Sequence, residues 1–106
     1  MRIKSLLLVA AVLGLMACSW VKLTSEGEKV RVLSQSEVAS CKKIGKTVVN
    51  VADSVAGLER KEHVVQENLV VLARNAAPDM GGDTVVAASP IADGKQTFDV
   101  YRCVGP

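Results

Sequence analysis

The sequence predicts an α+β fold, a single ββαββ domain in which one helix packs on one face of a mostly antiparallel sheet. Apolar residues recur at helical spacing in one long stretch, from about residue 58 to residue 77. Short valine-rich stretches bounded by glycine, proline and polar turn residues stand before and after it. The chain has 106 residues, enough for one domain.

Two valine-rich segments before the helix predict the first two strands. The first covers residues 30–33, and a turn at residues 34–36, with serines able to bond local backbone, follows it. The second covers residues 41–51, where valines and an isoleucine stand among lysines. Gly45 lies inside this strand and predicts a β-bulge or a close approach by another segment.

The predicted helix has an apolar face that should pack on the sheet. The residues of this face are Leu58, Val65, Leu69, Leu72 and Ala76. Pro78 has no amide hydrogen and would clash with the carbonyl of Arg74, so the helix should end or kink there. Gly81 and Gly82 then permit a tight exit.

The last two strands are predicted at residues 83–89 and 96–103, as an antiparallel hairpin. Pro90 ends the first of them, and the pair at residues 93–94, Asp-Gly, is a strong turn signal.

The alternation of side chains along the last strand leaves the place of Cys103 open. Phe98 and Val100 should face the helix, whereas Cys103 falls on the face of Tyr101. Either a bridge to Cys103 lies on the outer face or at the end of the sheet, or a bulge shifts the register.

The N-terminus has the pattern of an export signal. Arg2 and Lys4 precede an apolar run at residues 6–15, which is too short for a bilayer span of about 20 residues. The sequence Leu-Met-Ala-Cys at residues 15–18 resembles the bacterial lipobox. This resemblance implies that residues 1–17 are removed and that Cys18 is acylated on its sulfur and on its new amino group. The alternative is an ordinary secretory signal that contains a cysteine.

Two cysteines, Cys41 and Cys103, remain after lipidation of Cys18. An exported chain meets an oxidising compartment, so we expect them to form a disulfide. The sequence disfavours a reactive or metal-binding pair, because it has no Cys-x-x-Cys motif and one histidine. The loop closed would be roughly 60 residues, which stabilises a fold by on the order of 4 kcal/mol.

Residues 18–28 are expected to be the lipidated N-terminus and a tether, and residues 29–106 the domain. Trp20 either lies at the membrane headgroups, or packs on the domain or merely belongs to the tether. Residue 19 is serine, whereas the lipoprotein sorting rule uses aspartate there for inner-membrane retention. The expected location is therefore the outer membrane, facing the periplasm.

The mature chain is close to neutral, because two of the 13 Lys and Arg leave with the signal and the acidic residues number 11. This balance gives no reason to expect a nucleic-acid partner. Lys42, Lys43 and Lys46 form a local basic cluster, which is either a solvated strand edge or a contact for lipopolysaccharide or an acidic partner.

Two clusters of polar residues are candidate metal sites, and each also fits a surface or turn role. Glu59, His63 and Glu67 recur every four residues on the predicted helix, but such stripes are usually solvated. Asp79 and Asp83 lack the alternating acids of a calcium loop, which favours a helix-exit turn. The serines of residues 34–40 lack the partners of a nucleophilic site. We therefore expect no catalytic residue, metal or cofactor.

Several motifs resemble the YjeI-type small lipoproteins of unknown function. They are the run from Glu67 to Val86, Trp20-Val21, Cys41 followed by Gly45, and Tyr101-Arg102-Cys103. A more distant likeness is to the RcsF envelope-stress lipoprotein, in the alanine-rich helix end, Met80-Gly81 and the following valine strand. The resemblance implies a small α+β domain that interacts with other envelope proteins.

The expected function is a noncatalytic binding or envelope-sensing module, held to the membrane by its lipid anchor and acting on another envelope protein. The alternative is a small-ligand or metal-binding periplasmic lipoprotein.

Overall fold

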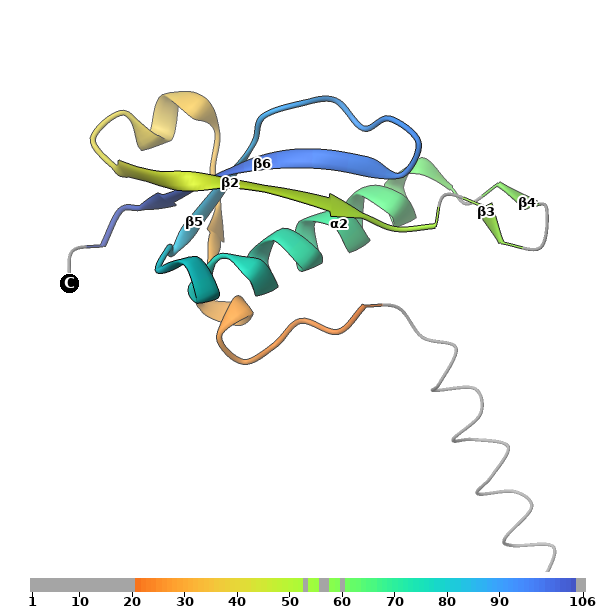
Figure 1. The fold of residues 1–106 in the computed structure, drawn as a ribbon, viewed down its shortest axis with the longest axis horizontal. Coiled ribbons are helices and arrows are strands. Elements are labelled where there is room, and N and C mark those ends of the chain that lie inside the picture. The colour runs from red at the N-terminus through yellow and green to blue at the C-terminus, as the bar shows by residue number, and fades with distance from the viewer. Residues whose placement is uncertain (1–20, 53, 56–57, 60, 105–106) are drawn as a thin grey trace, which may run out of the picture.

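Helix α2 and a four-stranded sheet form the two layers of the fold (Figure 1). The computed structural model describes residues 21–52, 54–55, 58–59 and 61–104. The elements in chain order are η1 (Gly27–Lys29), β1 (Arg31–Val32), η2 (Gln35–Val38), β2 (Lys42–Asn50), β3 (Ser54–Val55), β4 (Leu58–Glu59), α2 (Glu62–Ala76), η3 (Pro78–Met80), β5 (Thr84–Ala87) and β6 (Lys95–Arg102). The predicted α+β class is confirmed.

The sheet has the strand order β1-β5-β6-β2, so β1 and β2 are its two edges. The pairs β5–β6 and β2–β6 are antiparallel, and β1 pairs with β5 in parallel. The β2–β6 register shifts between Lys43 and Gly45, so a bulge, one of the two alternatives predicted at this glycine, is present. The Asp-Gly turn is also confirmed, because Asp93 and Gly94 both have positive φ and Ala92 bridges to Lys95.

The helix begins later than predicted. Residues 58–59 form strand β4, which pairs antiparallel with β3 as a separate two-stranded sheet, and α2 starts at Glu62. The predicted start at residue 58 was therefore wrong. Leu58 has the spacing of the apolar helix face, which is why the sequence placed it in the helix. In the structure it pairs with Val55 in the short hairpin. Periodicity alone does not distinguish a first helical turn from such a hairpin.

The helix ends as predicted. Its last residue is Ala76, and Pro78 opens the short helix η3. Gly81 then takes the left-handed conformation, with φ of 84°, which favours glycine because it has no Cβ.

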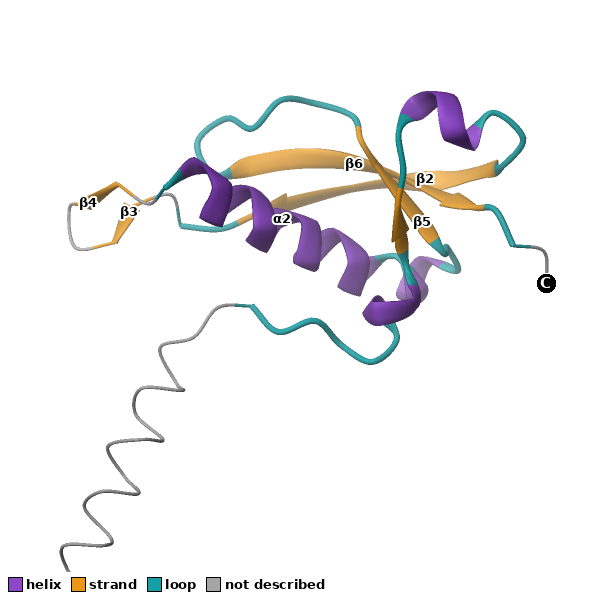
Figure 2. Cartoon of the chain, turned by 180° about the vertical axis from the view of Figure 1, so that it is seen from behind, coloured by secondary structure: helices purple, strands orange, loops and turns teal. Residues whose placement is uncertain are grey.

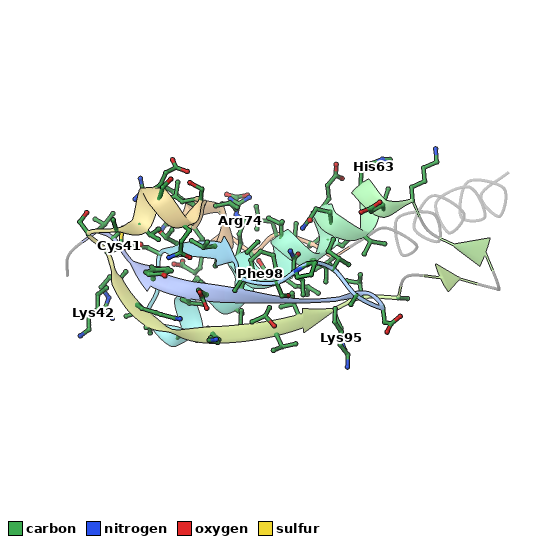
Figure 3. All side chains as sticks on the ribbon, turned by 90° about the horizontal axis from the view of Figure 1, so that it is seen from above. Cys41, Lys42, His63, Arg74, Lys95 and Phe98 are labelled. Carbon is green, nitrogen blue, oxygen red and sulfur yellow. A yellow bond between two sulfur atoms is a disulfide. The ribbon has the colours of Figure 1, made fainter. Side chains whose placement is uncertain are left out.

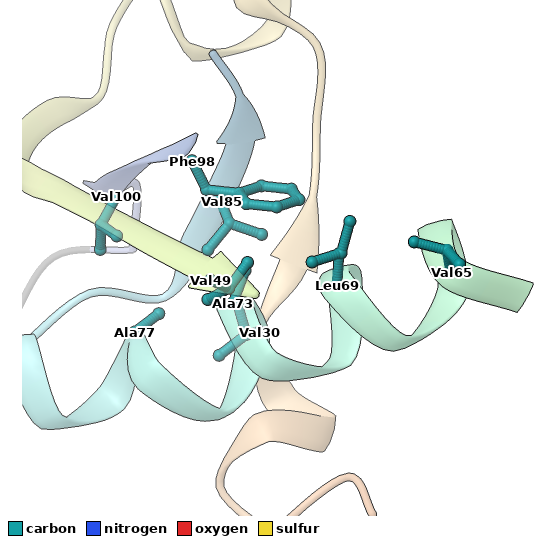
Figure 4. Close-up of a cluster of buried hydrophobic side chains, with 9 residues drawn as sticks. All are labelled: Val30, Val49, Val65, Leu69, Ala73, Ala77, Val85, Phe98 and Val100. Atoms are coloured by element: carbon teal, nitrogen blue, oxygen red, sulfur yellow. The ribbon is translucent and has the colours of Figure 1, made fainter. Parts of the chain in front are cut away.

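The main core lies between α2 and the sheet (Figure 4). It consists of Val30, Val49, Val65, Leu69, Ala73, Ala77, Val85, Phe98 and Val100. Phe98 and Val100 face the helix, as predicted. On the helix the centre of the buried face is Val65, Leu69 and Ala73, and Ala77, directly after the helix, continues it. Leu72 and Ala76 are only half-buried. The buried face of the helix is therefore rotated toward Ala73 and Ala77, relative to the predicted face. The small alanine side chains let the helix pack closely on the sheet.

A second cluster lies on the outer face of the sheet, away from α2. It consists of Val38, Val86 and Tyr101, with Leu33 and the two cysteines packed against them. Figure 2 shows η2 and α2 on opposite sides of the sheet. Of the open alternatives for Cys103, the structure selects the outer face beside Tyr101, where η2 covers the disulfide.

Candidate functional site

The segment before β1 is held against helix α2 by Asn75. The amide Nδ2 of Asn75 donates to the carbonyl oxygen of Lys22 at 2.8 Å. Its Oδ1 accepts hydrogen bonds from the backbone N–H of Thr24 at 2.8 Å and from the Thr24 hydroxyl at 3.1 Å. One side chain near the end of the helix therefore fixes two residues of the N-terminal segment.

Arg74 adds two contacts to the same segment. Its Nε donates to the carbonyl of Gly27 at 3.2 Å, and a terminal nitrogen donates to the carbonyl of Glu28 at 3.1 Å. Gly27 is buried, and a Cβ there would collide with Asn75 Oδ1. The last residues of the segment expected to be a tether are thus packed on the folded unit. We call this set of contacts, made by Asn75 and Arg74, the N-terminal clamp.

Replacing Asn75 with alanine is expected to release the N-terminal segment. The change removes three hydrogen bonds, and we expect it to destabilise the docked segment by about 1–2 kcal/mol, although alanine favours the helix. The backbone amides of Thr24 and Gly27 should then exchange with solvent faster. Glu67→Ala, at an exposed position on the same helix, is the matched control. Equal exchange rates in both variants would contradict the assigned role of Asn75.

The Cys41–Cys103 disulfide and the Asp83 carboxylate together fasten the C-terminal end of β6. The two Cα atoms lie 4.4 Å apart across 62 residues of sequence. Asp83 accepts hydrogen bonds from the backbone N–H of Cys103 at 2.8 Å, from that of Val104 at 2.9 Å, and from the Thr84 hydroxyl at 2.9 Å. The expected disulfide is confirmed. Asp83 lies after the helix exit and binds the backbone that follows β6. Asp79 is exposed in η3.

These donors change the acidity of Asp83. Burial raises the pKa of Asp83, but the bonds from Cys103, Val104 and Thr84, with the charge of Arg31, outweigh burial and hold the pKa below its ordinary value. A depressed pKa in the folded state means that the ionised carboxylate stabilises the fold above the ordinary pKa. This stabilisation is lost as the pH falls through the folded pKa.

Asp83→Asn is expected to remove part of the acid sensitivity of the protein. At neutral pH the variant should be less stable by about 1–2 kcal/mol, a value reduced for the partial exposure of the group. The two proteins should converge only as the pH falls through the folded pKa of Asp83, which lies below its ordinary value, because the wild-type carboxylate becomes protonated only there. Urea unfolding at several pH values measures this, with Asp79→Asn as the control. A constant difference from neutral to acidic pH would show that ionisation of Asp83 is not involved.

Ser34, the first serine of residues 34–40, stands directly before η2 and caps it. The backbone N–H and hydroxyl of Ser34 donate to Glu37 Oε1 at 2.9 and 2.8 Å. These two bonds, with a smaller effect of the Arg31 charge, hold the pKa of Glu37 below its ordinary value. Ser34 and Glu37 thus shape the helix that covers the disulfide.

The structure does not bring the proposed metal stripe together on one helix. Glu59 lies in β4, whereas His63 and Glu67 lie in α2, so the spacing of four residues no longer places the three on one face. The expectation that they share a helix face was wrong because the helix starts at Glu62. Within the described residues, no three His, Cys, Asp or Glu side chains are grouped to hold a metal ion.

The lysine cluster lies on the edge strand β2. Lys42, Lys43 and Lys46 are exposed, and Lys43 Nζ lies 3.4 Å from Oδ1 of the buried Asp99 on β6. Lys42 and Lys95 project from the β2 side of the sheet, whereas His63 lies on the opposite side of the molecule (Figure 3). Among the described residues, Lys42 and Lys46 make no ion pair.

Cys18, Trp20 and the signal at residues 1–17 lie outside the described residues. In the described part of the chain, no helix has the length and apolar character needed to cross a membrane.

The sequence reasoning missed Asn75, Arg74 and the role of Asp83 at the chain end. Asparagine is a poor helix former, so its presence near the end of α2 was a signal of a specific contact. For Arg74, nothing in the local sequence showed that an N-terminal segment lies against it.

Comparison with known proteins gives a family and no closer relative. No curated protein and no solved structure matches this chain. A family model described as "Domain of unknown function (DUF4156)" matches residues 21–103, a range that includes both the N-terminal clamp and the disulfide. The chain therefore belongs to the DUF4156 family.

Proposed function

We propose that this protein is an outer-membrane lipoprotein, anchored through acylated Cys18 on the periplasmic face, whose domain is a noncatalytic binding or envelope-sensing module. The lipobox at residues 15–18 supports the anchor, and the likeness to YjeI-type lipoproteins and to RcsF supports the envelope role. The observation that carries the proposal is the N-terminal clamp.

The clamp keeps the folded unit close to the anchor. Asn75 binds the carbonyl of Lys22, which is four residues after Cys18. An extended chain spans at most about 3.6 Å per residue, so Cys18 lies within about 14 Å of the clamped residue. A domain with so short a free linker stays beside the membrane and does not explore the periplasm on a long tether.

The clamp also orients the domain. The N-terminal segment lies on the α2 side of the two-layer fold, with the sheet and η2 beyond the helix (Figure 1). The anchor therefore enters from the helix side, which leaves the β2 edge available to another envelope protein. The stripe that suggested the alternative of a metal-binding protein does not lie on one helix, because Glu59 is in β4.

Radiolabelled palmitate tests the anchor. We expect label in the full-length protein and none in Cys18→Ser, with outer-membrane fractionation lost in the same variant. Cys41→Ser is the matched control, since it removes a cysteine and leaves the lipobox intact. Wild-type protein without label would contradict the anchor.

Photo-crosslinking in intact cells tests the binding role. A crosslinking residue at position 48, on the β2 edge, should capture a specific envelope protein, whereas one at exposed position 63 on the helix should not. The same captured protein at both positions, or none at position 48, would contradict a partner on the outer side.

A further inference from the structure

We propose that the open edge of β2, from Lys46 to Asn50, is a docking site for an extended acidic segment of a partner protein, which adds to the sheet as a further antiparallel or parallel strand. The inference rests on the proposed binding role and names the surface and the chemistry of the partner.

The backbone of alternate β2 residues points away from the sheet. The N–H of Val51 donates to the carbonyl of Gly94 at 2.8 Å, which directs residue 51 toward β6. Because alternate residues of a strand direct their backbone groups to the same side, Lys46, Val48 and Asn50 direct theirs to the edge. No described strand pairs with this edge. The β2 edge therefore offers three N–H and three C=O groups at regular spacing. An added strand needs such groups for its backbone hydrogen bonds.

The β6 side of the ladder agrees with this assignment. The carbonyl of Thr97 accepts from Ala88 at 2.9 Å, so residue 97, opposite Val48, directs its backbone toward β5. The bulge between Lys43 and Gly45 interrupts the regular alternation. The usable edge therefore begins at Lys46.

The charge along this edge selects an acidic partner. Lys42, Lys43 and Lys46 are three exposed cations within five residues, and Asp99, the acidic residue beside them, is buried against Lys43. Lys95, opposite Asn50 in the register, adds a fourth exposed cation. A carboxylate on an added strand would stand about 5 Å from Lys46 across the new pair, whereas Lys95 lies one strand further away on β6 and contributes at longer range.

Val48 supplies an apolar contact at the centre of the edge. Its side chain is 66 % exposed, and Val32 on the opposite edge is 47 % exposed. An added strand would cover Val48, and this apolar burial would supplement the backbone hydrogen bonds.

A second copy of the chain fits this edge less well. Pairing β2 with its own copy brings two sets of the same lysines to one interface, and edge lysines oppose such self-pairing. An acidic strand meets the same lysines with opposite charge. The feature that protects the edge from self-association thus favours the proposed partner.

Titration with a defined peptide tests the proposal. The probe is a short peptide in which glutamate alternates with valine, added to ¹⁵N-labelled full-length protein in detergent micelles. We expect slower hydrogen exchange at the amides of Lys46, Val48 and Asn50. The amides of Thr47 and Val49, which already face β6, should change little. A peptide with glutamine in place of glutamate is the control for charge and should bind about tenfold more weakly.

Two variants separate backbone pairing from charge attraction. Val48→Pro removes an edge N–H that has no partner in the sheet, so the fold should persist while peptide binding is lost. Val48→Thr keeps the amide and should bind. Lys46→Glu should weaken binding by about tenfold, whereas Lys61→Glu, an exposed lysine before the helix, should not.

Other outcomes would overturn the proposal. Peptide binding without protection of the alternate amides would show charge attraction alone, and no binding would remove the site. Dimerisation that Val48→Pro abolishes would assign the edge to a second copy. Binding to vesicles of anionic lipid with the same lysine dependence would assign it to a headgroup surface. Cys18→Ser should bind the peptide as well as wild type, so failure here and failure of the lipid anchor are distinguishable.

Discussion

Removal of the Cys41–Cys103 disulfide is expected to lower the free energy of unfolding by about 4 kcal/mol. The bridge joins residues separated by 62 positions, and in the chain-entropy model a loop of this length loses a large part of its unfolded-state freedom. The total stability of a small domain is about 5–15 kcal/mol, so the loss would be a large fraction of it. Urea unfolding of the Cys41→Ala, Cys103→Ala double variant measures the effect.

Addition of reductant provides the control for this prediction. Reductant should destabilise the wild-type protein and leave the double alanine variant unchanged, because the variant has no bridge to lose. Both cysteines pack beside Val38, Val86 and Tyr101, so alanine also removes some contacts there. A wild-type protein whose unfolding midpoint is the same with and without reductant would contradict a stabilising bridge.

Phe98→Ala is expected to cost about 3–5 kcal/mol of stability. Phe98 is 1 % exposed and has the largest of the fully buried side chains, in the centre of the core between α2 and β6. Truncation leaves a cavity that the surrounding side chains fill only in part. The unfolding midpoint in urea measures the loss.

Two further variants make this prediction specific. Val48→Ala, on the exposed outer edge, should change stability by less than about 0.5 kcal/mol. Phe98→Leu keeps most of the apolar volume and should cost much less than alanine. A small effect of Phe98→Ala would mean that the main core does not depend on this ring.

Much of the fold was predictable because local patterns and local structure agree. The bulge at Gly45, the helix end at Pro78 and the turn at residues 93–94 each depend on one or two residues with restricted backbone geometry. The direction of Phe98 and Val100 follows from strand alternation once a helix packs on that face.

Other features were not predictable, since they depend on contacts between distant segments. The rotation of α2 toward Ala73 and Ala77 depends on how closely the helix approaches the sheet. The position of Cys103 depends on η2, which covers the outer face some 60 residues away in sequence. The metal stripe failed for a related reason, because Glu59 pairs with Ser54 in a hairpin and is not part of the helix.

The sequence by itself determined the α+β class, the order of the main elements and the pairing of the two cysteines. It did so because hydrophobic period, glycine and proline act over a few neighbouring residues, and because only two cysteines remain if Cys18 is lipidated. Only the tertiary structure decided which helix face is buried, where the disulfide lies, and that Asn75 clamps the N-terminal segment. These depend on packing and hydrogen bonds between residues far apart in the chain, which no local pattern records.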